Sequence, residues 1–385
     1  MTINNEHKKL NVPNLRFPEF QGEWEELGLS ELLDFKNGLN PKPDKFGKGI
    51  KFISVMDILN NAVITYDCIK ASVDVTEKEL SDFSVEKGDI LFQRSSETLE
   101  DVGRANVYMD DKTAVFGGFV IRGKKKGEYA PQYFNYLLRS PFARKRIIPM
   151  GAGAQHFNIG QEGLSKVKLH FANIEEQKKI GKMLSLLDER ISTQNKIIDK
   201  LQSLIKGLRV SLMQIENGNI VHLGEIAQIY QPQTISSTEL TEDGFLVYGA
   251  NGIIGKYKQY NHKTEQICIS CRGNTCGMVN YTKPMSWITG NAMVINTDEH
   301  QNKVYKRYLY HYLSVYNFNS IISGSGQPQI VRTPLEQLKV PLPTFLEQKQ
   351  KATFLDKIQG KIEISNKTLN LYLQQKQYLL RQMFI

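Results

Sequence analysis

The residues best spaced for metal chemistry are three cysteines that lie close together in the sequence. Cys268 and Cys271 form a Cys-x-x-Cys pair, Cys276 follows them, and His262 is the nearest fourth ligand. Four such ligands in a tetrahedron bind zinc. However, Cys268 and Cys271 fall on a predicted strand, where residues three apart point to opposite faces. We therefore favour small buried or half-buried thiols over a zinc site, and we predict no metal ligands.

Other patterns of catalytic residues are incomplete. Pro43-Asp44 could open a metal-dependent nuclease motif, but the nearest acidic-x-Lys is far away at Asp110-Asp111-Lys112. Gly324-Ser325-Gly326 lacks the outer spacing of a nucleophile elbow. No Gly-x-x-x-x-Gly-Lys-Ser/Thr loop is present to bind a nucleoside triphosphate, and the seven histidines form no ligand cluster. The sequence therefore predicts no catalytic residue.

Two long stretches, in the middle and at the end of the sequence, have the heptad spacing of a coiled coil. Their apolar residues alternate at intervals of four and three, which places them on one stripe of a helix. Both stretches open with Glu-Gln-Lys, at 176–178 and 347–349, and the polar Gln194 and Ser365 interrupt the two stripes at the same point. A shared spacing with a shared interruption indicates that the chain is duplicated. The first stripe is Ile180, Leu184, Leu187, Ile191, Gln194, Ile198, Leu201, Ile205, Leu208 and Leu212, and the second is Lys351, Leu355, Ile358, Ile362, Ser365, Leu369, Tyr372, Lys376, Leu379 and Met383.

The segments before the two helices repeat more faintly. Short runs of β-forming residues, bounded by Gly, Asn and Asp, predict mixed, mostly β domains in the α+β class. The matching motifs are Leu29–Leu32 with Leu223–Ile226, Asp89–Ser95 with Gln266–Arg272, and Tyr133–Leu138 with Tyr308–Leu313. The predicted organisation is an N-terminal extension (1–23), a first domain (24–172), a central long helix (173–215), a second domain (216–343) and a C-terminal long helix (344–385).

Composition excludes several classes of protein. With 385 residues, 41% of them hydrophobic, the chain is long enough for two or three domains with ordinary cores. No apolar run is long enough for a membrane span, and the polar start Met1–Glu6 does not resemble a secretion signal. Four cysteines are too few for a disulfide scaffold, which favours a cytoplasmic location.

The net charge of +9 suggests a polyanionic partner only weakly, so its distribution matters more. Basic residues gather in 122–168, including Lys124-Lys125-Lys126 and Arg144-Lys145-Arg146, and in 303–343. This pattern favours one positive face on each domain, although a solvated lysine-rich surface is the alternative.

Several motifs in this order resemble the DNA-specificity subunits of type I restriction–modification systems. The first is Asn14-Leu15-Arg16-Phe17-Pro18-Glu19-Phe20, before the first domain. Gly88–Arg94 and Tyr248–Gly255 lie inside the two domains, and the repeated helix signature ends in Leu379-Leu380-Arg381-Gln382-Met383-Phe384. The resemblance covers nearly the whole chain.

The resemblance implies both an architecture and a role. Each domain would be a target-recognition domain that reads half of a bipartite double-stranded DNA site, and the two long helices would pair as an antiparallel coiled coil with a pseudo-two-fold repeat. Two modification (methyltransferase) subunits and the restriction (translocase/nuclease) subunits would assemble on this scaffold. The chain would have no catalytic site and no cofactor of its own, with S-adenosylmethionine, ATP and Mg²⁺ on the partner subunits.

Candidate DNA contacts lie in loops with Arg, Asn, Gln or Ser, near glycines. Arg, Asn and Gln carry paired donors and acceptors that match guanine and adenine edges, and glycine permits close backbone approach. Any single member could equally be an ordinary turn residue. The candidates are Arg94, Ser95, Ser96, Arg104, Gln155, His156, Asn158, Asn251, Arg272, Asn274, Thr275, Gln327 and Gln329.

The helices would set the distance between the two domains. A helix of about 39 residues spans about 58 Å at 1.5 Å per residue, and one turn of B-DNA is about 34 Å. Two domains held by such helices could therefore reach half-sites about one turn apart. The residues expected to pair across the helices are Leu187, Ile191, Ile198 and Leu201 with Tyr372, Leu369, Ile362 and Ile358, respectively.

Two other functions remain as alternatives to DNA reading: a DNA-processing enzyme with an unrecognised active site, and a two-armed coiled-coil scaffold unrelated to DNA.

Overall fold

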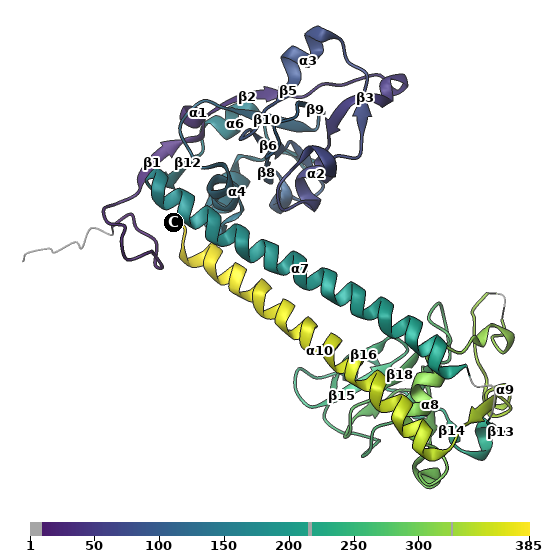
Figure 1. The fold of residues 1–385 in the computed structure, drawn as a ribbon. Coiled ribbons are helices and arrows are strands. Elements are labelled where there is room, and N and C mark those ends of the chain that lie inside the picture. The colour runs from purple at the N-terminus through teal and green to yellow at the C-terminus, as the bar shows by residue number, and fades with distance from the viewer. Residues whose placement is uncertain (1–9, 215–217, 325) are drawn as a thin grey trace, which may run out of the picture. The chain divides into compact units, whose positions relative to one another are not determined.

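The computed structural model describes residues 10–214, 218–324 and 326–385. Four parts of the predictions lie outside these ranges: residues 1–9 of the N-terminal extension, residue 215 of the central helix, residues 216–217 of the second domain, and Ser325 of Gly324-Ser325-Gly326. The chain divides into two units, the first comprising Met1–Asn195 with Thr368–Ile385 and the second Lys196–Lys367. The two long helices, α7 (Ile174–Met213) and α10 (Phe345–Gln382), therefore each contribute one part to each unit (Figure 1).

The first unit is built on a four-stranded sheet of order β2-β10-β6-β8, formed by Leu33–Asn37, Val120–Lys125, Ile90–Gln93 and Ala105–Val107. A second sheet has the order β4-β3-β9-β5, formed by Ser72–Val73, Phe46–Ile53, Ala114–Phe116 and Ser84–Val85, and in it β3 and β9 are parallel. The pair β1 (Glu25–Gly28) and β12 (Lys168–Phe171) lies next to α7 in sequence. The helices are α1 (Leu29–Leu32), α2 (Val55–Asn60), α3 (Glu77–Phe83), α4 (Pro131–Arg139), α5 (Pro141–Ile147) and α6 (Gln161–Ser165).

The second unit repeats this topology. Its four-stranded sheet β14-β20-β17-β18 comprises Gln228–Tyr230, Ala292–Asn296, Ile267–Ser270 and Val279–Tyr281, and the pair β13 (Asn219–His222) and β21 (Lys339–Leu342) corresponds to β1 and β12. A three-stranded sheet β16-β15-β19 comprises Gly252–Tyr257, Phe245–Gly249 and Trp287–Ile288, and β15 and β19 are parallel, as β3 and β9 are. The remaining helices are α8 (Lys306–Leu313) and α9 (Arg332–Glu336). The predicted α+β fold with an internal repeat is confirmed.

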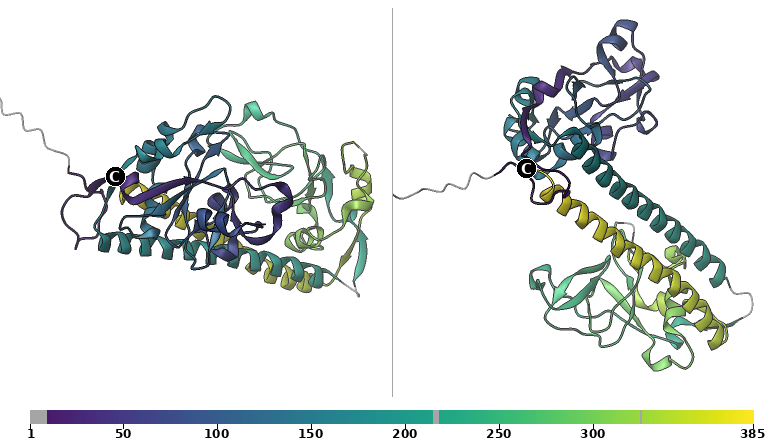
Figure 2. Two further views of the ribbon diagram at one scale, coloured as in Figure 1. Left: turned by 90° about the horizontal axis from the view of Figure 1, so that it is seen from above. Right: turned by 60° about the vertical axis from the view of Figure 1, so that its left-hand side comes forward.

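In both units a part of α7 packs against a part of α10, and the two parts run in opposite directions. In the first unit the start of α7 (Ile180, Leu184) shares a core with Leu380 at the end of α10 and with Met383 directly after it. Figures 1 and 2 show these segments side by side. In the second unit the end of α7 and the start of α10 share a cluster, whose members include Leu201, Ile205, Leu355, Ile358 and Ile362.

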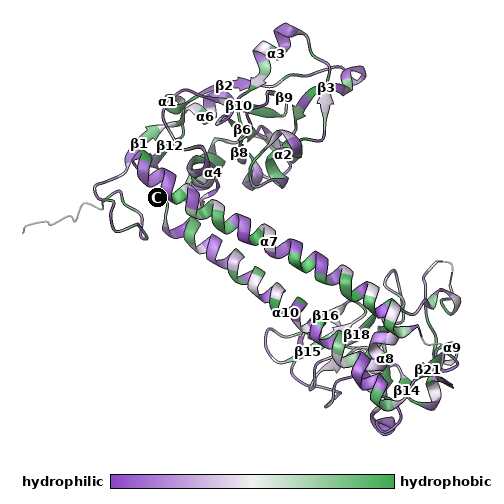
Figure 3. Cartoon of the chain, viewed as in Figure 1, coloured by the Kyte–Doolittle hydropathy of each residue, from purple (hydrophilic) through white to green (hydrophobic). Residues whose placement is uncertain are grey.

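The residues expected to pair across the helices are all buried or half-buried. Leu187, Ile198, Ile358 and Ile362 are buried, and Ile191, Leu201, Leu369 and Tyr372 are half-buried. Figure 3 shows apolar and polar residues alternating along both helices, as the heptad pattern requires.

The two lysines in the heptad stripe of α10, Lys351 and Lys376, each have a partner on α7. Lys376 forms an ion pair with Asp188 of α7 at 2.5 Å, and the hydroxyl of Tyr136 donates to the same carboxylate at 2.8 Å. Lys351 donates to the carbonyl of Leu212 at 2.8 Å, at the end of α7 where backbone carbonyls lack helical partners. These charges are therefore compensated within the helix pair.

The N-terminal segment is fastened to the start of α7. The guanidinium of Arg16 donates two hydrogen bonds to the carboxylate of Glu176, each 2.8 Å long, and this carboxylate is fully buried. Paired, bidentate geometry is what allows a buried charge to be stable. The N–H of Leu15 also donates to the carbonyl of Gln382 at the end of α10, 2.9 Å away.

Candidate nucleic-acid interface

In the first unit, two loops far apart in the sequence pair with each other. Strand β7 (Ser95–Ser96) follows β6 and pairs antiparallel with β11 (Phe157–Asn158). The hydroxyl of Ser95 hydrogen-bonds to the side-chain oxygen of Asn158, and the N–H of Ile159 donates to the carbonyl of Arg94 at 2.9 Å. Six of the predicted DNA contacts therefore belong to one site, the first loop cluster, which consists of Arg94, Ser95, Ser96, Gln155, His156 and Asn158.

The glycine-rich turn of this cluster is closed by backbone hydrogen bonds. The N–H of Ala152 donates to the carbonyl of Asn158 at 2.9 Å, and the N–H of Asn158 donates back at 2.8 Å. A side chain at Gly153, whose φ is +145°, would collide with the carbonyl of His156. The turn therefore needs glycine, and it holds Gln155 and His156 exposed at its tip.

The second unit contains the equivalent pairing. Arg272 bridges antiparallel to Gln329, and the N–H of Ile330 donates to the carbonyl of Cys271 at 3.0 Å. Gln329 and Ser323 close the turn with reciprocal backbone bonds of 2.9 and 2.8 Å. Arg272, Gln327 and Gln329, all exposed, form the second loop cluster.

Four predicted DNA contacts lie outside these clusters. Arg104 is paired with Asp101 at 2.5 Å. Asn274 and Thr275 lie in the turn after β17, where the Thr275 hydroxyl is 3.1 Å from that of Ser270. Asn251 lies in the tight β15–β16 turn on a different sheet. Residue type and a nearby glycine were the grounds for predicting these four contacts. They do not place a residue in a cluster, because strand pairing decides which loops meet.

One further turn, not among the predicted contacts, lies against each cluster. In the first unit it is Gly117–Val120, between β9 and β10, and in the second it is Thr289–Ala292, between β19 and β20. The available signal was the Gly-Gly and Gly-Asn dipeptides between predicted strands, which are typical of turns.

The predicted single positive face on the first domain is not what the structure contains. Lys124 and Lys126, at the end of β10, form ion pairs with Glu86 and Asp34 at 3.3 and 3.2 Å. Arg144 turns inward and donates to the carbonyls of Glu100 and Val102, and burial lowers its pKa to about 10. The density of basic residues in 122–168 therefore did not predict a positive face, because strand and helix geometry places these side chains on different parts of the domain.

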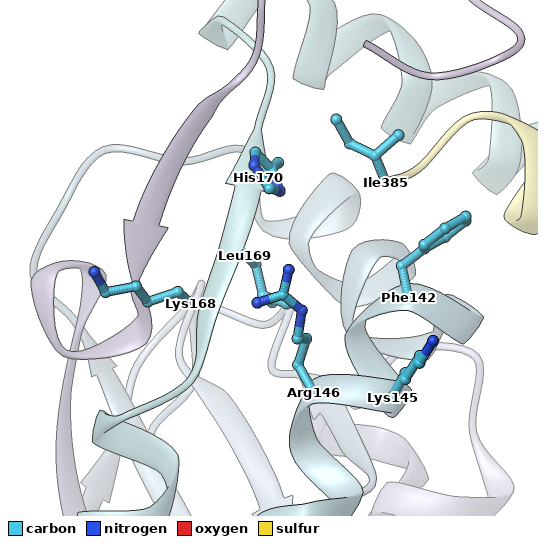
Figure 4. A pocket seen from close by; sticks show the side chains of 7 residues that line it. All are labelled: Phe142, Lys145, Arg146, Lys168, Leu169, His170 and Ile385. Atoms are coloured by element: carbon cyan, nitrogen blue, oxygen red, sulfur yellow. The ribbon is translucent and has the colours of Figure 1, made fainter. Parts of the chain in front are cut away.

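Three other cations of this run, Lys145, Arg146 and Lys168, line a separate small cavity. Figure 4 shows Lys145 and Arg146 of α5 opposite Lys168 and His170 of β12, around a cavity of about 280 Å³. Phe142, Leu169 and Ile385 supply its apolar lining.

The cysteines and histidine of the zinc alternative do not form a four-ligand site, although Cys276 packs against the same core as Cys271. Cys268 lies in one hydrophobic core and Cys271 in another, as strand alternation predicts. His262 hydrogen-bonds instead to the hydroxyl of Tyr230 at 2.8 Å. Burial raises the pKa of the Cys268 thiol to about 12, so it remains protonated at neutral pH. Among the residues the structure describes, no group of three or more His, Cys, Asp or Glu side chains could hold a metal ion.

Each loop cluster is thus a group of exposed or half-buried hydrogen-bond donors and acceptors on loops that pair at the end of a sheet strand. Guanidinium, carboxamide and hydroxyl groups can recognise base edges or phosphates. None of the helices in the described part of the chain is long and apolar enough to span a bilayer.

Comparison with known proteins identifies the family. The model of the type I restriction modification DNA specificity domain matches residues 21–203 and again 216–373. A putative type I restriction enzyme specificity subunit of Methanocaldococcus jannaschii is 26% identical over 94% of this chain and 92% of its own length. The EcoprrI specificity subunit of Escherichia coli is 31% identical over 35% of this chain and 34% of its own length.

Solved structures share the fold. A type I restriction–modification S subunit from M. genitalium aligns with a TM-score of 0.67 and 19% identity, over 97% of this chain and 99% of the other. A chain from a structural study of type I complex assembly aligns with a TM-score of 0.56 and 15% identity, over 93% and 96%. With two matches that together span most of the sequence, and a duplicated fold that agrees with them, this chain belongs to the type I restriction–modification DNA-specificity family.

Proposed function

We propose that the chain reads a bipartite duplex DNA sequence, with the first loop cluster on one half-site and the second on the other. The observation that carries this proposal is the repetition of the loop pairing. Ser95 with Asn158 and Arg272 with Gln329 occupy equivalent positions in the two units, yet their side chains differ. The same frame with different polar groups is what two readers of different sequences require.

The other predicted contacts would bind the DNA backbone and not the bases. They are Arg104, Asn251, Asn274 and Thr275. All four are exposed or half-buried, and hydroxyl, amide and guanidinium groups of this kind can bind phosphates or sugars. Such contacts fix the register of the protein on DNA without specifying its sequence.

The paired helices α7 and α10 would hold the two readers at a fixed distance and serve as the scaffold for the methyltransferase and restriction subunits. This part of the proposal is supported by the family match and by the apolar stripe that the two helices share in each unit. We expect S-adenosylmethionine, ATP and Mg²⁺ to bind to those partner subunits, where the methylation, translocation and cleavage would take place.

A domain exchange tests the proposal. Residues 24–172 are replaced by the equivalent segment of another specificity chain, and methylated adenines are mapped in cells that also express the methyltransferase subunit. The expected result is a change in one half of the methylated sequence, because residues 216–343 and both helices are unaltered. An exchange that changed both halves would contradict independent reading. Catalytic activity on DNA by the purified chain alone, without its partner subunits, would instead favour the alternative of a DNA-processing enzyme.

A further inference from the structure

Phe119 stands on a tight turn with its ring largely in solvent. The turn Gly117–Val120 is closed by a hydrogen bond from the N–H of Val120 to the carbonyl of Gly117 at 2.8 Å, so Phe119 is its third residue. Its exposed fraction is 69%. An aromatic ring so exposed contributes little to the core, so burial does not explain why this turn carries it.

The second unit has the same turn with a different residue at that position. Thr289–Ala292 is closed by a hydrogen bond from the N–H of Ala292 to the carbonyl of Thr289 at 2.9 Å, and its exposed third residue is Asn291. Strand register makes the two turns equivalent. Val120 pairs with the last residue of β6, and Ala292 pairs with the last residue of β17.

Each turn is bonded to the loop cluster of its own unit. The carbonyl of Phe119 accepts a hydrogen bond from the N–H of Arg94 at 2.9 Å, and that of Asn291 accepts one from the N–H of Cys271 at 3.2 Å. The next residues along the chain are Ser95 and Arg272, the members of the two clusters that pair with the glycine-rich turns. Phe119 and Asn291 therefore lie at the same edge of the two equivalent clusters.

At the glycine before each residue, a second segment of the chain packs closely against the turn. A Cβ on Gly118 would lie 1.9 Å from the side-chain oxygen of Asn40, and a Cβ on Gly290 would lie 2.3 Å from the hydroxyl of Thr234. Both turns are thus held on two sides, by the cluster loop and by this segment. The backbone from which each exposed side chain projects is therefore fixed, which reduces the ordering that recognition of a base would require.

We propose that Phe119 and Asn291 are equivalent specificity determinants, Phe119 contacting a thymine methyl group in one half-site and Asn291 the hydrogen-bonding edge of an adenine in the other. The inference rests on the proposed function and adds the residues that read one base pair in each half. The neighbouring Arg, Asn and Gln side chains carry the paired groups that suit major-groove edges, so the adjacent turn faces the same groove. There the methyl group of thymine is the apolar feature available to a phenyl ring, and adenine offers the donor–acceptor pair that a carboxamide matches.

The test compares Phe119→Ala and Asn291→Ala with Phe142→Ala and Asn302→Ala, which remove a partly exposed aromatic ring and an exposed amide elsewhere in the respective units. Methylated sequences are mapped in cells with the methyltransferase subunit present. We expect Phe119→Ala to relax selectivity at one base pair of one half-site and Asn291→Ala at one base pair of the other, each by roughly tenfold. The two control variants should methylate the wild-type sequence.

A second measurement isolates the contact made by Phe119. Thymines of its half-site are replaced one at a time by deoxyuridine, which removes only the methyl group, and binding by the purified methyltransferase–specificity complex is measured. One replacement should weaken the wild-type complex severalfold and leave the Phe119→Ala complex unaffected. Equal losses in both complexes, or none at any thymine, would overturn the assignment of Phe119.

The outcomes separate this inference from the proposed function. A wild-type complex that methylated no defined two-part sequence would refute the proposed function. A defined sequence that persisted unchanged in both Phe119→Ala and Asn291→Ala would refute only the inference. Both residues are exposed, so unchanged melting temperatures are expected and would show that the variants are folded.

Discussion

The side-chain oxygen of Gln177 accepts a hydrogen bond from the backbone N–H of Ala130 at 2.9 Å, which ties the first turn of α7 to the start of α4. The amide nitrogen of Gln177 donates to the carbonyl of Ala172 at 2.8 Å. In the second unit, Gln348 accepts from the N–H of Tyr305 at 2.8 Å, at the start of α8. The repeated Glu-Gln-Lys motif is therefore the joint between each long helix and its domain.

Removing this joint should destabilise the first unit. Gln177 is 4% exposed, so Gln177→Ala would leave the N–H of Ala130 and the carbonyl of Ala172 buried without partners. We expect a loss of about 2–4 kcal/mol in the free energy of unfolding, measured by urea denaturation. Lys178→Ala, at the exposed neighbouring position, is the control and should change little. Equal effects of the two substitutions would contradict the role given to Gln177.

Neighbouring isoleucines on α7 offer a matched test of helix pairing. Ile198 is 6% exposed and Ile197 is 41% exposed. Ile198→Asp would place a charge in the apolar stripe, at a cost of several kcal/mol, whereas Ile197→Asp adds a charge at the surface. We expect Ile198→Asp to abolish modification and restriction together in cells, with Ile197→Asp close to wild type. Full modification of the same site by Ile198→Asp would rule out pairing as the basis of assembly.

Lengthening both helices should move the half-sites apart. One added heptad after Gln194 and one after Ser365 keeps the apolar spacing and extends the pair by about 10 Å. This corresponds to about three base pairs of duplex, so the unread gap should widen by that amount while both half-sites stay the same. Mapping of methylated adenines reads out the gap. A heptad added to α7 alone mismatches the helices and should abolish methylation, and an unchanged gap with both insertions would show that the helices do not set the distance.

The buried His311 should make the second unit sensitive to acid. Its Nδ1 accepts from Arg209 of α7 at 3.1 Å, its Nε2 lies 3.0 Å from Asp356 of α10, and Arg307 approaches the same carboxylate. Burial, reinforced by the nearby guanidinium groups, lowers the pKa of His311 below its ordinary value, although Asp356 opposes this shift. The neutral ring is therefore the form that the folded unit favours.

The sign of the effect follows from proton binding. Below about pH 6.5 the unfolded chain takes up a proton on this histidine before the folded chain does, so stability present above that pH is lost as the pH falls. The loss is at most about 1.4 kcal/mol per pH unit. Unfolding of the second unit followed between pH 7.5 and 5.5 should show this slope, and His311→Gln should reduce it. An identical slope in the variant would assign the acid sensitivity to other groups.

The features that depend on the spacing of residues along the chain were predictable from the sequence. The heptad stripes, the duplication and the long helices depend on periodicity, because helix geometry converts a spacing of three and four into one face. The helix predicted at 173–215 is observed at Ile174–Met213, and that predicted at 344–385 at Phe345–Gln382. The type I specificity family followed from the same repeated signature.

Only the tertiary structure decided which distant residues meet. Ser95 and Asn158 are 63 residues apart, and Asp188 and Lys376 are 188 apart, so each contact depends on strand or helix pairing that residue spacing does not encode. The same pairing brought the turn of Phe119 to the edge of the first loop cluster and sent the basic run 122–168 to separate places. Local periodicity is fixed by the covalent chain, whereas long-range partners are fixed by the packing of whole elements, and only the folded chain specifies that packing.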